Sequence, residues 1–68
     1  MEQKIEVSAF DIKLTQLLAE GYAMKEIAAH VGLSARTVEG HFLRLRKRLA
    51  CKNGSHLVAI FFRAELIK

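Results

Sequence analysis

The sequence comprises 68 residues, of which 51% are hydrophobic and 26% charged, and it carries a formal net charge of +4. This length provides one small domain with little room for an enclosed active site, and the apolar content predicts a folded chain. A single cysteine, Cys51, excludes an internal disulfide. With no recognisable signal peptide and no apolar run longer than six residues, the sequence predicts a cytoplasmic protein without a membrane span.

Strand-like alternation of apolar and polar residues is hard to find, so the sequence predicts an all-α fold. Residues 1–7 are predicted to form a flexible lead-in, and residues 8–68 a single domain. Ser8 stands before the first apolar pattern, with Asp11 three residues later, which predicts a capping box at the start of a helix. Glycine follows Glu20, and the first helix is therefore predicted to end there.

A second, shorter helix is predicted at about 24–30. Its start is weak, because Ala23 stands where a serine or threonine would cap the helix. Gly32 can then adopt the positive φ of a sharp turn, and Leu33 can fill the corner between two helices. The packing side of the second helix is predicted to contain Ile27, Ala28 and Val31.

The third predicted helix is the longest, at about 35–50. Ser34 precedes it and can cap its first turn through the side-chain hydroxyl. Apolar residues recur along it at helical spacing, which predicts one buried stripe. The residues of this stripe are Val38, Phe42, Leu45 and Leu49.

A fourth helix is predicted at about 56–66, after the turn signal Asn53-Gly54 and with Ser55 as its cap. This segment is apolar on nearly every side, although three other helices offer only one face to pack against. Part of its apolar surface is therefore predicted to contact a partner. The adjacent residues Phe61 and Phe62 are predicted to divide between the core and that interface.

The positive charge is concentrated in one segment. Residues 36–52 contain six Lys or Arg and only one acidic residue, Glu39, a net charge of +5, whereas the rest of the chain carries −1. A concentration of this kind predicts a surface that binds a polyanion such as nucleic acid. The alternative interpretation is a solvated helix face with no partner.

A short helix, a turn with glycine and a longer basic helix form the pattern of a helix-turn-helix. Residues 17–59, "LLAEGYAMKEIAAHVGLSARTVEGHFLRLRKRLACKNGSHLVA", closely resemble the DNA-binding domain of LuxR/FixJ-type bacterial regulators, the GerE-like four-helix domain without a wing. The resemblance extends from Val7 to Ile67. It rests on Leu18, Gly21, Lys25, Glu26, Ile27, Ala28, Leu33, Ser34, Thr37, Val38, His41, Leu45, Leu49, Asn53 and Val58.

In that family the third helix enters the major groove and the fourth mediates dimerisation. The resemblance therefore implies sequence-specific binding of double-stranded DNA in transcription regulation, as a homodimer on the DNA. The predicted contacts to backbone phosphates come from Lys25, Ser34, Arg36, Thr37, His41, Arg44 and Arg48. Base contacts are predicted for Glu39, Gly40 and Leu43, and the dimer interface is predicted to contain Leu57, Ile60, Phe61 and Ala64.

Two of the predicted base-reading positions depart from the family pattern. Glu39 and Gly40 stand where many relatives have Lys followed by a β-branched residue. Glu39 has two interpretations: it accepts a hydrogen bond from cytosine N4, or it stays in solvent and pairs with Arg36 or Arg46. Leu43 either contacts a thymine methyl group or is an exposed residue without a role.

Two other functions remain as alternatives. The chain could be a protein-interaction module that binds another regulator through its apolar last helix, or a promoter reader resembling region 4 of sigma factors, which would not need residues 55–67. No enzyme activity is predicted, because the sequence has no nucleophile–base pair, carboxylate dyad or phosphate-binding glycine loop. No metal or cofactor is predicted; RNA polymerase is a candidate further partner, and DNA binding would place the protein at the nucleoid.

Overall fold

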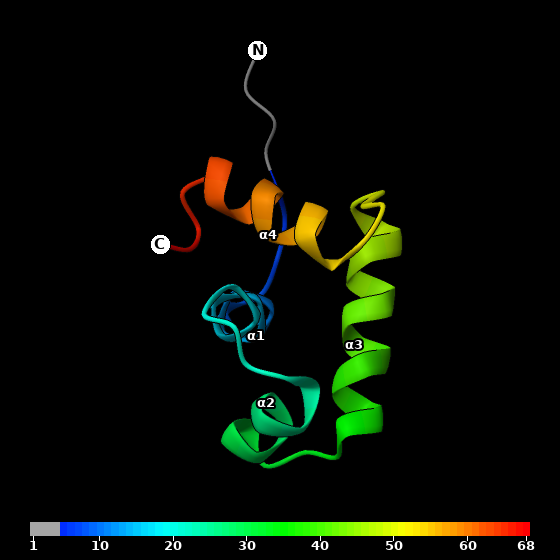
Figure 1. Cartoon of the computed structure of the whole chain (residues 1–68). Coiled ribbons are helices and arrows are strands. Elements are labelled where there is room, and N and C mark those ends of the chain that lie inside the picture. The colour runs from blue at the N-terminus through cyan, green and yellow to red at the C-terminus, as the bar shows by residue number, and fades with distance from the viewer. Residues whose placement is uncertain (1–4) are drawn as a thin grey trace.

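The structure, a computed structural model, describes residues 5–68. Over these residues it contains four helices and no strand: α1 (Ala9–Ala19), α2 (Met24–Val31), α3 (Ala35–Arg48) and α4 (Gly54–Arg63). The all-α prediction is therefore confirmed. In Figure 1, α1 is seen end-on at the centre, with α4 across it above, α2 below and α3 running along one side of all three.

The predicted lead-in lies partly outside the described residues, which begin at residue 5. Residues 5–7 are not helical, yet two of them contact the domain. Val7 packs against the core, and the carbonyl oxygen of Glu6 accepts a hydrogen bond from Arg48 of α3 at 3.3 Å. The end of the lead-in is therefore attached to the third helix.

The start of α1 has the predicted capping box. The hydroxyl of Ser8 accepts the N–H of Asp11 at 3.0 Å, and the Asp11 carboxylate accepts the N–H of Ser8 at 2.9 Å. These reciprocal bonds satisfy two backbone donors that a helix N-terminus otherwise leaves unpaired. The helix ends at Ala19, close to the predicted position, and the chain turns at Gly21 with a φ of 95°.

The helix-turn-helix consists of α2, the turn at Gly32 and α3. Gly32 has a φ of 74°, in the left-handed region that only glycine adopts without strain, as predicted. Ser34 caps α3 by accepting the N–H of Thr37 at 3.1 Å. The prediction for Leu33 is wrong, because its side chain is exposed and does not fill the corner.

The first turn of α2 is incompletely capped. Glu26 accepts the N–H of Ala23 at 2.8 Å, which is one half of a capping box, but Ala23 has no side-chain acceptor for the other half. The backbone of Ala23, with φ −74° and ψ 163°, already has the extended conformation of an N-cap residue. A hydroxyl at this position would therefore meet the free N–H of Glu26 without a change of backbone.

Replacing Ala23 by serine is expected to raise the free energy of unfolding by about 1 kcal/mol, because it supplies the missing half of the cap. For a domain of this size the melting temperature should rise by roughly 4–8 °C, measured by circular dichroism. Ala29→Ser, at an exposed interior position of the same helix, is the matched control and should give no rise. A melting temperature of Ala23→Ser at or below that of the parent would contradict the prediction.

The core lies where the four helices meet. Every helix contributes to it, and α3 does so through the predicted stripe, although Leu49 is only partly buried. Two residues of α4, Leu57 and Phe61, have no exposed surface. The buried apolar residues are Leu14, Ile27, Ala28, Val38, Phe42, Leu45, Leu57, Phe61 and Ile67.

The bounds of α4 differ from the prediction at both ends. Asn53, not Ser55, caps the helix, because its side-chain oxygen accepts the N–H of His56 at 2.8 Å. The helix then ends at Arg63, three residues early, because Glu65 adopts a φ of 61° and the N–H of Leu66 bonds back to the carbonyl of Phe61 at 2.9 Å. This turn brings Ile67 into the core.

The third helix also ends early, at Arg48 and not at residue 50. Ala50 adopts a φ of 57°, and the N–H of Cys51 bonds to the carbonyl of Arg46 at 2.8 Å. This is the same left-handed ending that closes α4. Among residues 5–68 no helix is long and apolar enough to cross a membrane.

Candidate nucleic-acid interface

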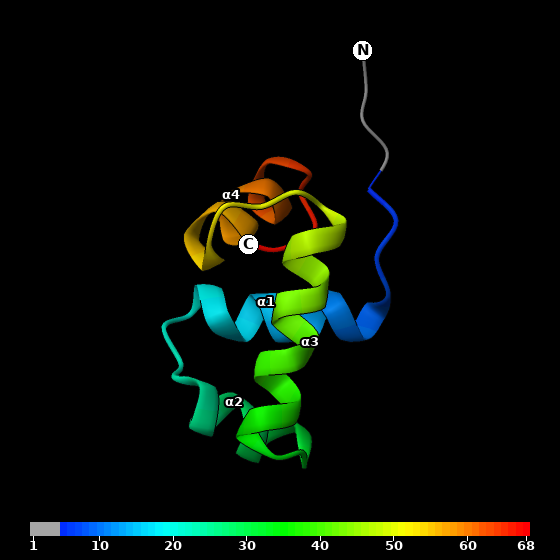
Figure 2. The same cartoon turned by 90° about the vertical axis from the view of Figure 1, so that its right-hand side faces the viewer.

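One side of α3 faces solvent along its whole length. Figure 2 views the molecule from this side, and none of the other helices covers it. Because α3 buries the stripe that begins at Val38, the positions on the opposite side form an outward row. The row contains Arg36, Gly40, Leu43 and Lys47, of which all but the half-buried Gly40 are exposed.

The cations of this surface have few acidic neighbours. In the part of the chain that the structure describes, the only ion pairs are those that Asp11 makes with His41 and Arg48. Exposed Lys25, Arg36 and Arg44 therefore keep uncompensated charges. Such charges attract a polyanion over a distance of about a Debye length.

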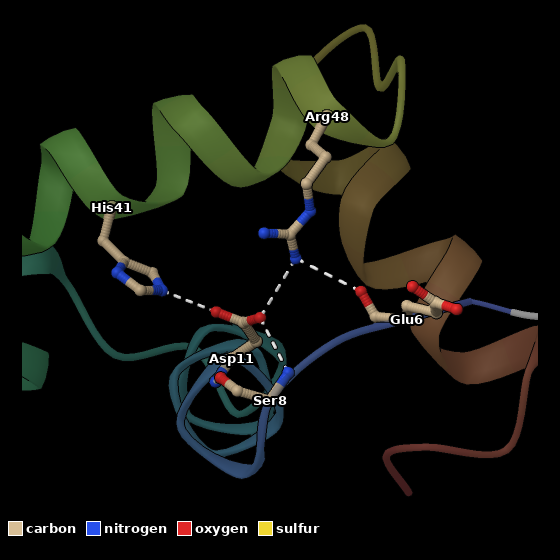
Figure 3. A network of polar contacts seen from close by, with 5 residues as sticks. All are labelled: Glu6, Ser8, Asp11, His41 and Arg48. Carbon is tan, nitrogen blue, oxygen red and sulfur yellow. Dashed lines mark hydrogen bonds and ion pairs between the residues drawn. The ribbon is translucent and has the colours of Figure 1, made fainter.

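Asp11 joins the start of α1 to α3, as Figure 3 shows. The Nε2 atom of His41 lies 2.6 Å from Asp11 Oδ1, and Nη2 of Arg48 donates to Asp11 Oδ2 at 3.2 Å. His41 and Arg48 are seven residues apart, so both point from one side of α3 toward the same carboxylate. Phe10 adds an edge-to-face contact with the His41 ring, with centroids 5.2 Å apart.

Asp11 is nearly inaccessible to solvent, with 4% of its surface exposed. Burial alone would raise the pKa of its carboxyl. The hydrogen bonds from the Ser8 N–H, His41, Arg48 and the Ser8 side chain together outweigh burial and hold the pKa of Asp11 below its ordinary value. Asp11 is therefore a carboxylate at neutral pH and accepts hydrogen bonds from the Ser8 N–H, His41 and Arg48.

Because the Asp11 carboxylate only accepts hydrogen bonds, His41 must donate its Nε2–H to it. A neutral imidazole then has only a lone pair at Nδ1 and offers no donor to a phosphate. Only a doubly protonated ring would have an Nδ1–H for that purpose. Arg48 is less constrained, because its remaining guanidinium N–H groups are on a largely exposed side chain.

The two hydroxyls at the start of α3 are also linked. Ser34 Oγ accepts the N–H of Thr37 and donates its own proton to Thr37 Oγ1 at 2.9 Å. This arrangement uses the only donor of the Ser34 side chain and leaves the hydroxyl proton of Thr37 free. Of these two predicted phosphate contacts, Thr37 is the one with a donor to offer.

Glu39 is exposed beside the outward row of α3, on the opposite flank of that row from Arg44. Within residues 5–68 it makes no ion pair, so the predicted pairing with Arg36 or Arg46 is not observed. Leu43 is also exposed. Both side chains are therefore accessible to a ligand on the outward side of the helix.

The predicted dimer interface on α4 requires a correction. Leu57 and Phe61 have no exposed surface and belong to the core, so neither can contact a second copy while the domain keeps this fold. Ile60 is half-buried and Ala64 is exposed. The most exposed large apolar side chain in the described chain is Phe62, at 61%, next to buried Phe61.

Two residues that shape this interface, one exposed and one buried, are not among the predicted site residues. Lys47 lies in the outward row of α3, and its spacing from Arg36 and Gly40 could have indicated it. Asp11 was predicted only as a capping residue, because its partners His41 and Arg48 follow 30 and 37 residues later and no local pattern reveals such contacts.

Groups of side chains that could hold a metal are not found among residues 5–68. Cys51 is half-buried beside the end of α3. Burial raises the pKa of its thiol, against the opposing effect of the Arg46 charge. A thiol in this state has little thiolate at neutral pH and is poorly suited to nucleophilic chemistry.

Comparison with known proteins identifies a family and several regulators. The family described as bacterial regulatory proteins, luxR family, matches residues 11–61. Transcriptional regulatory protein UhpA of Escherichia coli K12 is 40% identical over 50 residues, covering 74% of this chain and 26% of UhpA. Oxygen regulatory protein NreC of Staphylococcus aureus JH9 is 31% identical over 62 residues, covering 91% of this chain and 29% of NreC.

This chain thus spans between a quarter and a third of the length of these relatives. No solved structure matches it.

Proposed function

The chain belongs to the luxR family of bacterial regulatory proteins, whose helix-turn-helix domains bind DNA, and we propose that α3 enters the major groove of a specific DNA site. The observation that carries the proposal is the solvent-facing side of α3. There Arg36, Arg44 and Lys47 are exposed without an acidic partner among the described residues.

Contacts to the DNA backbone are proposed for the predicted side chains that have free donors. Lys25 on α2 and Arg36 on α3 each supply a charge, and Thr37 supplies a hydroxyl proton. Arg48 and His41 contribute less, because Asp11 already balances their charge or occupies their donor. Their proposed role is to fix the orientation of α3 on the domain.

Base contacts are proposed for one residue of the outward row of α3 and for one residue on the flank beside it. Glu39 can accept from the N4 amino group of cytosine, and exposed Leu43 can contact the methyl group of thymine. The lack of an ion pair at Glu39 in the described chain supports the first assignment, since the carboxylate is not committed elsewhere.

Dimerisation through α4 is proposed for the side of the helix opposite Leu57 and Phe61. Positions three, four and seven residues apart share that side. Phe62 is its largest apolar residue, and burying its exposed ring would stabilise a dimer at roughly 25 cal/mol per Å². The proposed interface consists of Ser55, Val58, Ala59 and Phe62.

A single exposed aromatic ring and its small neighbours make a modest interface. We therefore propose that two copies associate weakly in solution and fully on DNA, where two half-sites hold them together. The same exposed ring is the observation that favours the second candidate function, a contact with another regulator. Cytoplasmic location and an encounter with RNA polymerase at a promoter are proposals that follow from a role in transcription.

Selection of bound duplexes from a random pool tests the proposal. The parent is expected to enrich one sequence that contains two similar half-sites related by a dyad, because a symmetric dimer presents α3 twice. Phe62→Glu places a charge in the interface and should reduce the enriched sequence to a single half-site, with weaker retention. Circular dichroism checks that the variant remains folded.

Ala9→Glu is the matched control, since it adds the same charge at an exposed position on α1. It should lower retention slightly and preserve the paired half-sites. Failure of the parent to enrich any sequence would refute specific DNA binding. If Phe62→Glu still selects paired half-sites, dimerisation through this side of α4 is refuted. The exposed Phe62 would then favour the second candidate function, a contact with another protein.

A further inference from the structure

Gly40 lies inside α3, where the fold gives no reason for a glycine. Its backbone is helical and it is not among the glycines with positive φ. A Cβ atom placed there would meet only one atom outside its own helix backbone and chain neighbours, Nη1 of Arg44 at 3.5 Å, which is an ordinary contact distance. Glycine at a helix interior lowers stability relative to alanine. Alanine at this position would therefore stabilise α3, yet the centre of the outward side has glycine.

Arg44 lies directly beside the position that a Cβ atom of residue 40 would occupy. Position 44 lies one turn later, on the flank of α3 that also contains His41 and Arg48. Its guanidinium, however, reaches back to within 3.5 Å of the Cβ position of residue 40. The charge of Arg44 is thereby brought from the flank to the middle of the outward side.

This placement distinguishes Arg44 from the other cations. Arg48 is held by Asp11, whereas Arg44 makes no ion pair among residues 5–68. Arg44 also differs from Arg36 because its guanidinium lies next to Gly40, which has no side chain. Guanidinium is planar and presents paired N–H donors, which match the O6 and N7 acceptors of guanine in the major groove.

We infer that Arg44, lying beside Gly40, contacts a guanine base edge and sets the base preference at one position of the DNA site, in place of the phosphate contact predicted for it. The inference rests on the proposed function, since it requires α3 to lie in the major groove. Gly40 has two effects in this arrangement. It places no branched side chain where the guanidinium lies, and it lets the helix backbone approach the bases closely.

The test begins with the site that the parent selects from random duplexes. Arg44→Ala should reduce discrimination at one guanine by roughly 5- to 150-fold, the range for a bidentate base contact. Arg44→Lys should also lose that discrimination, because an ammonium group cannot form the paired bonds, although the charge is kept. Neither variant should change the base preference at the other positions.

Gly40 provides a second pair of variants. Gly40→Ala should melt about 2–8 °C higher than the parent and keep the guanine preference, because its Cβ fits beside Arg44 without displacing it. Gly40→Val adds two branched methyl groups where the guanidinium lies and should lose the guanine preference as Arg44→Ala does. Circular dichroism establishes that each variant is folded.

Arg36→Ala is the matched control for a phosphate contact. It should weaken binding to all sequences equally and lower the magnitude of the salt slope by about 0.9 per subunit. The inference is overturned if Arg44→Ala behaves in this way and retains every base preference. A parent that prefers no sequence would refute the proposed function itself, which is a different result from a specific parent whose guanine preference does not depend on Arg44.

Discussion

Replacing Asp11 by alanine is expected to lower the free energy of unfolding by about 2–4 kcal/mol, measured by urea denaturation. The substitution removes half of the α1 capping box and leaves both His41 and Arg48 without their partner. Hydrogen bonds to a charged group are each worth more than neutral ones. Since small domains have few kcal/mol to spare, much of the Asp11→Ala protein should be unfolded at 37 °C.

Asp11→Asn separates the charge from the shape of the side chain. It should cost less than Asp11→Ala, since an amide oxygen can still accept from one donor. Glu20→Gln is the control, because Glu20 is an exposed acid just after the C-terminal end of the same helix and its loss should have little effect. Equal stability of Asp11→Ala and the parent would show that the link between α1 and α3 contributes nothing.

Acid titration examines the same carboxylate in the unmodified protein. The pKa of Asp11 is lower in the folded state than its unfolded value of about 3.9, so its contribution is complete above that value. The contribution is lost as the pH falls through the folded pKa. The parent should therefore lose more stability below about pH 4 than Asp11→Asn does, and identical acid limbs would contradict this assignment.

Affinity for DNA is expected to fall steeply with salt. If Lys25 and Arg36 each neutralise one phosphate, log K should fall against log salt with a slope of about −1.8 for a monomer and −3.6 for a dimer. From 50 to 200 mM salt a dimer would thus lose roughly 100-fold in affinity, and a monomer about tenfold. Fluorescence anisotropy with a labelled duplex measures both values.

Variants of single cations show which charges produce the slope. Lys25→Ala or Arg36→Ala should each reduce its magnitude by about 0.9 per subunit. Lys13→Ala removes an exposed cation from α1, away from the outward side of α3, and should leave the slope unchanged. An affinity that does not vary with salt would exclude phosphate contacts by this surface.

The sequence was sufficient to predict the helices wherever the signal was local. The capping box at Ser8, the cap at Ser34 and the left-handed Gly32 are all set by residues within one turn of each other, and all are confirmed. The ends of α3 and α4 were predicted too late. Each helix closes with a left-handed residue, which is Ala50 after α3 and Glu65 after α4. Because neither residue is glycine, the sequence does not indicate where these helices end.

The site was harder to predict because it depends on contacts between distant residues. A helix that is apolar on nearly every side, like α4, does not reveal which of Phe61 and Phe62 is buried; burial depends on where α1 lies. The hydrogen bonds of His41 and Arg48 to Asp11 likewise form only because α1 and α3 cross at this point. Local sequence patterns predict which side chains could contact DNA or a partner. The packing of the helices determines which of these side chains are buried or bonded within the domain.

We expect the contact between Asp11 and α3 to couple the local unfolding of two parts of the chain. Fraying of the first turn of α1 removes the capping carboxylate and, with it, the partner of His41 and Arg48. The amide hydrogens at the start of α1 and those in the second half of α3 should thus exchange with solvent at a common opening free energy. A DNA segment that holds α3 in place would then slow exchange at the start of α1, a site it need not touch.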